Sequence, residues 1–207
     1  MRCVAMRCVV MVLVILLVAP VSQGRIEITP FGGHQGGGEF EDYNTDSELE
    51  IKEDSVAGIM LGFGPEAGDA QLELYFSRQE TELEGSGAFS NASLFELDVD
   101  YYHIGGSFTF DQGKLRPFIA ASLGATSFDP KFSGADAETN FSLGLGGGVK
   151  WFFTERIGLR LEGRVFGTFI DNESAAFSGP NGGVIVVGHS DVLVQYNAVV
   201  GLIFVIP

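Results

Sequence analysis

The stretch GGGVKWFFTERIGLRLEGRVF, residues 146–166, decides the fold. After a polar break at residues 154–156, apolar and charged side chains alternate. The apolar set is Ile157, Leu159, Leu161 and Val165, and the charged set between them is Arg160, Glu162 and Arg164. A period of two predicts a β-strand with one apolar and one charged face. The class of protein depends on which of these faces lies inside.

The same alternation recurs along the chain. It predicts strands at about 25–40, 48–63, 70–79, 95–110, 115–127, 139–153, 157–170 and 192–206. Segments of roughly ten residues or more have the length of strands in an outer-membrane barrel. In the fourth segment Ile104 and Phe108 fall out of phase, which predicts a β-bulge near Tyr102–Gly105. We find no convincing helical period.

The connections between these segments alternate in length. Short polar turns lie at 64–69, 111–114 and 154–156, and long polar connections lie at 41–47, 80–94, 128–138 and 171–191. Short turns at one end and long loops at the other are the layout of a bacterial outer-membrane barrel. In that layout both termini are periplasmic and the long loops are extracellular. A soluble sandwich has no reason to sort its loops in this way.

Side-chain size indicates which face is inside. The apolar set is bulky throughout, whereas the alternate set is charged, small or glycine. An eight-stranded barrel has a narrow interior, so small residues and paired charges belong there and the apolar set faces lipid. Aromatic side chains are expected at the membrane interface, and the candidates are Trp151, Phe153, Tyr196 and Phe204.

The beginning of the chain indicates export. Residues 1–24 combine a positive start, an apolar run at 9–19, and small residues Ser22 and Gly24 before a cleavage point, which is typical of a signal peptide. Both cysteines lie inside this segment, so disulfide and thiol chemistry are excluded for the rest. Residues 25–207 are expected to form one barrel domain.

The charge balance excludes one class of partner. Residues 25–207 carry ten basic and 27 acidic side chains, a net charge of −17, which argues against nucleic acid. The chain is 45% hydrophobic with 18 Phe, so it is no disordered acidic tail. No stretch after the signal peptide is apolar enough for a transmembrane helix.

The inward charges are the most informative candidate site. The acidic members on the third and fourth strands are Glu73, Glu96, Asp98 and Asp100. The members on the fifth to seventh strands are Arg116, Lys150, Arg160, Glu162 and Arg164. Opposite charges that meet across a lumen need partners, because an unpaired buried charge is costly. We favour a structural plug of ion pairs, and the alternative is a narrow conducting path with a transverse field.

Other candidates are weaker. The acidic stretch 39–54 is interpreted as a solvated loop, with a divalent-cation site shared with lipopolysaccharide phosphates as the alternative. His34 and His103 are isolated on strands and are expected at the interface or in the lumen. The adjacent residues 189–191 (His, Ser, Asp) make no catalytic triad, whose members converge from separate places. We expect no metal, no cofactor and no catalytic residue.

Several motifs carry a resemblance to a known family. They are ITPFGGHQGGGEFE (28–41), FELDVDYYHIGGSFTF (95–110), GKLRPFIAASLGATSF (113–128), GGGVKWFFTERIGLRLEGR (146–164) and NAVVGLIFVIP (197–207). With these residues the chain resembles the small outer-membrane barrels that include the OmpA-like and opacity-type proteins. Gly201, Phe204 and Ile206 fit the final strand that the barrel-assembly machinery recognises in that family.

The resemblance implies an all-β fold, an eight-stranded antiparallel up-and-down transmembrane barrel. It implies a monomer in the outer membrane that contacts lipid and lipopolysaccharide and is assembled by the barrel-assembly machinery. A structural or surface-interaction role is favoured, a narrow porin-like pore comes second, and a lipid-modifying enzyme comes third. All three stay open, because a fold does not specify an activity. The rival fold is a soluble lipocalin-like barrel.

Overall fold

A computed structural model describes residues 24–42, 47–65, 68–85, 92–110, 113–131, 137–170, 176–178, 184–188 and 192–206. The expected signal peptide therefore lies outside the described residues, except for Gly24. No helix in the described part of the chain is long and apolar enough to cross a membrane.

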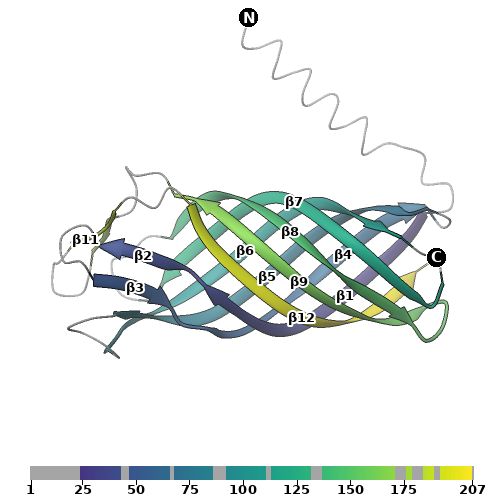
Figure 1. Ribbon diagram of the computed structural model, residues 1–207, viewed down its shortest axis with the longest axis horizontal. Helices are drawn as coiled ribbons and strands as arrows, with labels where there is room; N and C mark the ends of the chain where they lie inside the picture. Colours follow the sequence, from purple (N-terminus) through teal and green to yellow (C-terminus); the bar gives the residue numbers. More distant parts are fainter. Residues whose placement is uncertain are drawn as a thin grey trace, which may run out of the picture.

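All described regular structure is β-strand. The strands are β1 (Gly24–Gly37), β2 (Glu39–Asp42), β3 (Ser47–Ile51), β4 (Asp54–Pro65), β5 (Ala70–Gly85), β6 (Ala92–Thr109), β7 (Leu115–Pro130), β8 (Glu138–Phe152), β9 (Ile157–Phe169), β10 (Ala176–Ser178), β11 (Val184–Gly188) and β12 (Val192–Ile206). Strands β4–β1–β12–β9–β8–β7–β6 are neighbours in that order, and β5 pairs with both β6 and β4. The eight long strands thus close an antiparallel barrel, which leaves no open edge (Figure 1). The predicted fold class is confirmed.

The connections sort by length between the two ends of the barrel. The short connections from β4 to β5, β6 to β7 and β8 to β9 lie at the end where β1 begins and β12 finishes, here called the turn end (Figure 1). The longer connections, which include β2, β3, β10 and β11, lie at the opposite loop end. Strands β10 and β11 correct the expectation of a loop at 171–191. Strands β5 and β6 also continue into 80–94, where a connection was expected.

A glycine pair lies between β1 and the two-stranded ribbon of β2 and β3 that continues it. Gly37 and Gly38 have φ angles of 82° and 105°, a region that side chains with a Cβ rarely adopt. Beyond this point β3 takes the place of β4 beside β5, with Ile51 opposite Leu83. The Ile51 N–H donates to the Gly38 carbonyl at 3.0 Å, which joins the two arms of the ribbon at its base.

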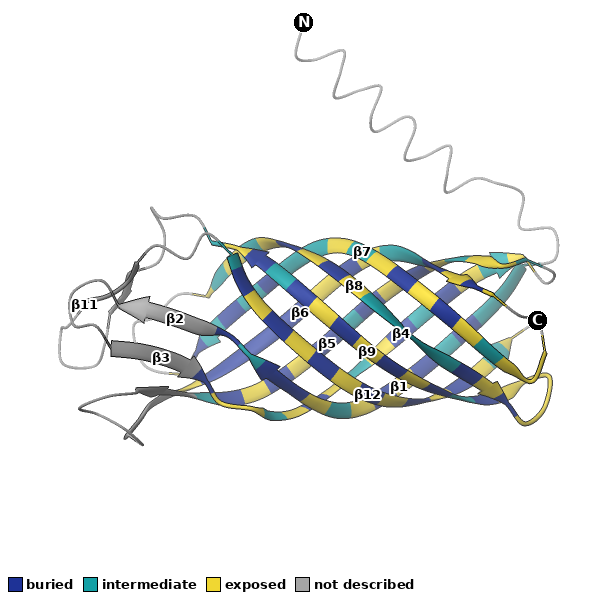
Figure 2. Ribbon diagram, in the orientation of Figure 1, coloured by how far each residue is buried: buried dark blue, intermediate teal, exposed yellow. Residues whose placement is uncertain are grey.

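Burial answers which face of β9 is inside. Arg160, Glu162 and Arg164 are buried, whereas Leu161 and Val165 are about half exposed on the outer wall. The same alternation of buried and exposed positions crosses the whole barrel (Figure 2). The charged face therefore lines the lumen, and the apolar face forms the exterior.

Strand β6 departs from the prediction. Its pairing with β5 is continuous from Phe108 to Phe95, so the bulge predicted near Tyr102–Gly105 is wrong, and the irregularity lies instead between Leu83 and Glu84. Leu97 and Val99 were expected to face lipid, but both are buried within the barrel, in phase with Tyr101. The loop-end half of the lumen contains large apolar and aromatic side chains, so the rule of small or charged interior residues fails there.

We predict that neighbouring residues on opposite faces of β9 differ sharply in their effect on stability. Phe166→Ala removes a fully buried ring and should lower the free energy of unfolding by about 3–5 kcal/mol. Val165→Ala trims a half-exposed side chain and should cost about 1 kcal/mol or less. Urea unfolding of the refolded variants in lipid vesicles measures both. The reverse order would contradict the assignment of inner and outer faces.

Candidate functional site

The lumen nearest the turn end holds a network of ion pairs around Glu73 of β5. Arg160 of β9 donates two hydrogen bonds to this carboxylate, from Nη1 to Oε1 at 2.8 Å and from Nη2 to Oε2 at 3.1 Å. Ser107 of β6 donates a third at 2.7 Å. Such a two-point arginine–carboxylate contact fixes geometry as well as charge. Glu73 therefore connects opposite walls of the barrel.

Strand β9 supplies an alternating row of charges to the same network. Glu162 accepts a hydrogen bond from Arg160 Nε at 2.7 Å and another from Arg164 Nε at 2.8 Å. Residues two apart on a strand point to the same face, so these three side chains all reach the lumen. Lys150, directly opposite Arg160 on β8, donates to Glu27 Oε2 at 2.8 Å.

Aromatic rings flank the buried cations. The Arg160 guanidinium carbon lies 4.3 Å from the centre of the Phe118 ring, and that of Arg164 lies 4.5 Å from the centre of the Tyr75 ring. A cation over the face of a ring is attracted to it, more strongly when both are desolvated. The rings thereby cover the sides of the guanidinium groups that the carboxylates leave open.

An aromatic layer follows the ion pairs in the direction of the loop end. Tyr101 and Phe166 stack with ring centres 4.1 Å apart, and Phe31 stacks on Tyr75 at 5.3 Å. His103 is held in this layer between two hydroxyl groups, with Ser122 Oγ 3.0 Å from Nδ1 and Ser142 Oγ 2.9 Å from Nε2. His103 is thus a satisfied lumen residue, one of the two places expected for it.

Amide side chains form the layer nearest the loop end. Gln35 donates to Gln79 at 2.8 Å, and the Tyr101 hydroxyl donates to Gln195 at 2.7 Å. Gln195 in turn donates to the Gly37 carbonyl at 3.3 Å. Ionic, aromatic and amide layers thus follow one another along the lumen.

The sequence-predicted lumen residues divide into two groups. The structure brings together Glu73, Lys150, Arg160, Glu162 and Arg164, as described above. Arg116 lies at the turn-end mouth, with its guanidinium carbon 4.3 Å from the centre of the Phe152 ring.

Glu96, Asp98 and Asp100 do not join this network, and that expectation is corrected. Inward positions on β6 are taken by Leu97, Val99 and Tyr101, so the alternate acidic residues face the outer wall, where Asp98 and Asp100 are buried beneath their ion-pair partners. Glu96 is exposed.

Asp98 and Asp100 belong instead to a charged cluster on the outer wall near the loop end. Arg78 of β5 donates to both oxygens of Asp100, at 2.7 and 2.6 Å, and the Arg78 side chain is 48% exposed. Lys131 pairs with Asp98 at 2.8 Å and with Asp129 at 3.0 Å. Hydrogen bonds to these two carboxylates raise the pKa of Lys131.

The network also contains residues that the sequence analysis missed. Glu27 lies between Ile26 and Ile28 on β1, an alternation that marks it as inward-facing. Arg25 pairs with Glu27, with 3.1 Å between Nη2 and Oε1. The period of two around Glu27 is the sequence signal that indicates its inward position.

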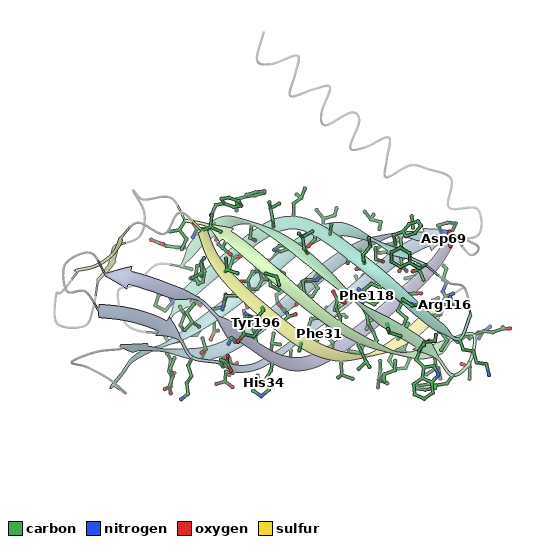
Figure 3. All side chains as sticks on the ribbon, viewed as in Figure 1. Phe31, His34, Asp69, Arg116, Phe118 and Tyr196 are labelled. Carbon is green, nitrogen blue, oxygen red and sulfur yellow. The ribbon has the colours of Figure 1, made fainter. Side chains whose placement is uncertain are left out.

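The four aromatic residues expected at the membrane interface all lie on the exterior. Trp151 and Phe153 make an edge-to-face pair with ring centres 4.8 Å apart at the turn end, and Phe204 is exposed. Tyr196 lies farther toward the loop end and donates to Glu53 at 2.6 Å (Figure 3). Their place at a lipid–water boundary remains a prediction.

The structure adds little support for the weaker candidate sites, which are the remaining histidines and the acidic stretch 39–54. His34 is exposed on the outer wall (Figure 3). Residues 189–191 lie outside the described residues, as do the side chains of 39–50. Within the described ranges there is no group of three or more His, Cys, Asp or Glu residues that could hold a metal ion.

Comparisons with known proteins extend the fold assignment. No protein-family model and no curated protein matches the chain. The outer-membrane protein OprG from Pseudomonas aeruginosa has a similar structure, with a TM-score of 0.61 and 11% identity over 89% of this chain and 96% of that chain. Neisserial surface protein A is also similar, with a TM-score of 0.57 and 13% identity over 87% and 96%. The fold is that of a small outer-membrane barrel. At these identities the likeness concerns the fold alone.

We predict that Glu73→Gln lowers the free energy of unfolding by about 3–5 kcal/mol, because it leaves buried cations without their carboxylate. Glu80→Gln is the matched control, since Glu80 is exposed on the outer face of the same strand and should change stability by about 0.5 kcal/mol or less. Chemical unfolding in detergent, followed by Trp151 fluorescence, measures both. Equal losses in the two variants would contradict the ion-pair network.

Proposed function

We propose that this protein is a non-enzymatic integral protein of the bacterial outer membrane with a structural or surface-interaction role. In this proposal the barrel is a plugged, non-conducting anchor, and the loop end makes the contacts. The observation that carries the proposal is the lumen, which is filled by ion pairs, stacked rings and amides while the exterior is apolar.

The exterior supports insertion into lipid. Large exposed apolar side chains occur on β4, β5, β6, β7, β8, β9 and β12, so they surround most of the barrel. An exposed apolar surface of this extent is unfavourable in water and favourable in hydrocarbon. A closed barrel also satisfies its backbone hydrogen bonds internally, which a bilayer requires.

The lumen supports a plug. A permeating ion would have to displace Arg160 from Glu73 and then pass the stack of Tyr101 on Phe166. Breaking a buried ion pair leaves an uncompensated charge, which costs several kcal/mol. The largest lumen side chains also pack in contact with one another, so little space is left for a hydrated ion.

The layout of the ends supports an orientation. The described chain begins and finishes at the turn end, which we assign to the periplasm, and the acidic loop end is assigned to the cell exterior. In this arrangement the outer wall contacts lipid and lipopolysaccharide, and β12 is the strand presented to the barrel-assembly machinery. We propose a monomer, because the closed barrel has no unpaired long strand to extend.

A narrow pore is the second candidate. The feature that favours it is the separation of charge across the lumen, with Glu73 on β5 facing Arg160 and Arg164 on β9. Opposed charges of this kind produce a transverse field that selects among small ions. The two candidates differ in a directly measurable property, the ion current.

We predict that the refolded protein gives no discrete current steps in a planar lipid bilayer. A difference in gel mobility between the unboiled and the boiled sample verifies that the inserted protein is folded. The double variant Arg164→Ala, Phe166→Ala removes one member of the ionic layer and one of the aromatic layer and should conduct if it remains folded. Steady current steps from the folded wild-type protein would instead establish the pore.

A further inference from the structure

Three buried polar atoms in the lumen have no hydrogen-bond partner of good geometry among the described residues. They are Oε1 of Gln35 on β1, Oγ of Ser77 on β5 and Oδ1 of Asn197 on β12. The three residues are at most 3% exposed, so bulk solvent does not reach them. Because an unpaired buried polar atom costs free energy, three of them together indicate a bound ligand that supplies the missing hydrogen bonds.

The strand register brings the three residues together. Gln35 and Asn197 lie directly opposite each other on β1 and β12, and both are buried on the lumen side. Gln35 donates to Gln79 at 2.8 Å, and Asn197 donates to the Tyr75 hydroxyl at 2.9 Å. Tyr75, Ser77 and Gln79 are successive inward residues of β5. The two amides therefore reach β5 on either side of Ser77.

The direction of the Gln35 amide is fixed by its neighbour. Gln79 Nε2 donates to the backbone carbonyls of Gln35 and Lys52, at 3.2 and 3.3 Å. The side-chain oxygen of Gln79 is therefore turned toward the Gln35 side chain, which must present its nitrogen to it. The side-chain oxygen of Gln35 is consequently left for another donor.

Ser77 provides the third contact and the space for a ligand. The Tyr75 hydroxyl interacts with the Ser77 side chain, but this contact lacks the geometry of a full hydrogen bond. The interaction places Ser77 Oγ beside the same hydroxyl that Asn197 contacts. Serine is also much shorter than tyrosine and glutamine, so its position between Tyr75 and Gln79 leaves room between the two amides.

The chemistry of the three atoms identifies the ligand. Two of them are amide oxygens, which only accept hydrogen bonds, and the serine hydroxyl can donate one. A ligand that donates twice and accepts once matches this set, and water is the smallest molecule that does so. A metal cation is disfavoured, because none of the three groups carries a negative charge and Arg164 lies directly opposite Asn197 on β9.

We propose that this lumen site binds one structural water molecule that joins β1, β5 and β12. The water donates to Gln35 Oε1 and Asn197 Oδ1 and accepts from the Ser77 hydroxyl. It links the aromatic layer, through Tyr75, to the amide layer, through Gln79. Three hydrogen bonds hold it in place, so it belongs to the packed lumen and not to a mobile column of water. The water site is independent of any partner at the loop end.

The test is a nuclear Overhauser measurement on the refolded full-length protein in detergent micelles. Magnetisation transfer is expected between water and the side-chain NH2 protons of Gln35 and Asn197, with the sign of a slowly tumbling complex. Water that moves freely through a pore gives no transfer of this sign, so the measurement separates a bound water from a hydrated lumen. Absence of transfer at both amides would overturn the proposal.

Ser77→Val tests the assignment, because its branched side chain removes the hydroxyl and fills the place of the water. Both transfers should be lost in the folded variant. Thr126→Val is the matched control, since it removes another fully buried lumen hydroxyl, one that contacts Thr168 directly at 2.9 Å. This variant should keep both transfers. Equal behaviour of the two variants would contradict the site.

A crystal structure of the wild-type protein is a second measurement that requires no variant. We expect one electron-density peak within about 3.2 Å of Gln35 Oε1, Ser77 Oγ and Asn197 Oδ1. Direct hydrogen bonds among the three side chains, with no peak between them, would overturn the proposal. A peak at the shorter distances of a metal cation, about 2.0–2.6 Å, would also overturn it.

Discussion

The contact between Glu73 and Arg160 is the constraint on which the arrangement of the lumen depends. Closing eight strands into a barrel turns every second side chain inward, whether or not it is apolar. Charges forced into such a space are tolerated only in pairs with good geometry. Glu73 meets this requirement from one wall and the arginines of β9 meet it from the other. The network therefore holds together strands that share no backbone hydrogen bonds.

Much of the fold follows from the sequence because an alternation of period two requires no knowledge of distant contacts. The run from Ile157 to Val165 already separates lipid-facing from lumen-facing positions, and the register then brings Lys150 opposite Arg160. The outer direction of the apolar face follows from volume, since bulky side chains do not fit a narrow interior.

The errors in assigning inner and outer faces from the sequence occur near the loop end. There, bulky side chains do lie inside the barrel. There Val99 and Tyr101 pack inside, and Asp98 and Asp100 turn outward to meet Arg78 and Lys131. A charged side chain near a membrane boundary can extend toward water, so charge alone does not indicate the lumen. Sequence alternation assigns residues to two faces, but their inner or outer position at a rim depends on partners from other strands. The short β11 run was missed for a related reason, because a few β-branched residues inside a long connection give too weak a signal.

The amide layer has a consequence for how the loop end can vary in sequence. Gln195 holds the carbonyl of Gly37, while Gln79 and Thr81 hold that of Lys52, at 3.3, 3.3 and 2.6 Å. The bases of the β2–β3 ribbon are therefore fixed from within the lumen and owe little to the residues beyond them. Substitutions and insertions beyond these hydrogen bonds can therefore leave the internal contacts of the barrel unchanged. The loop end is thus free to vary in sequence and length while the barrel itself is inherited intact.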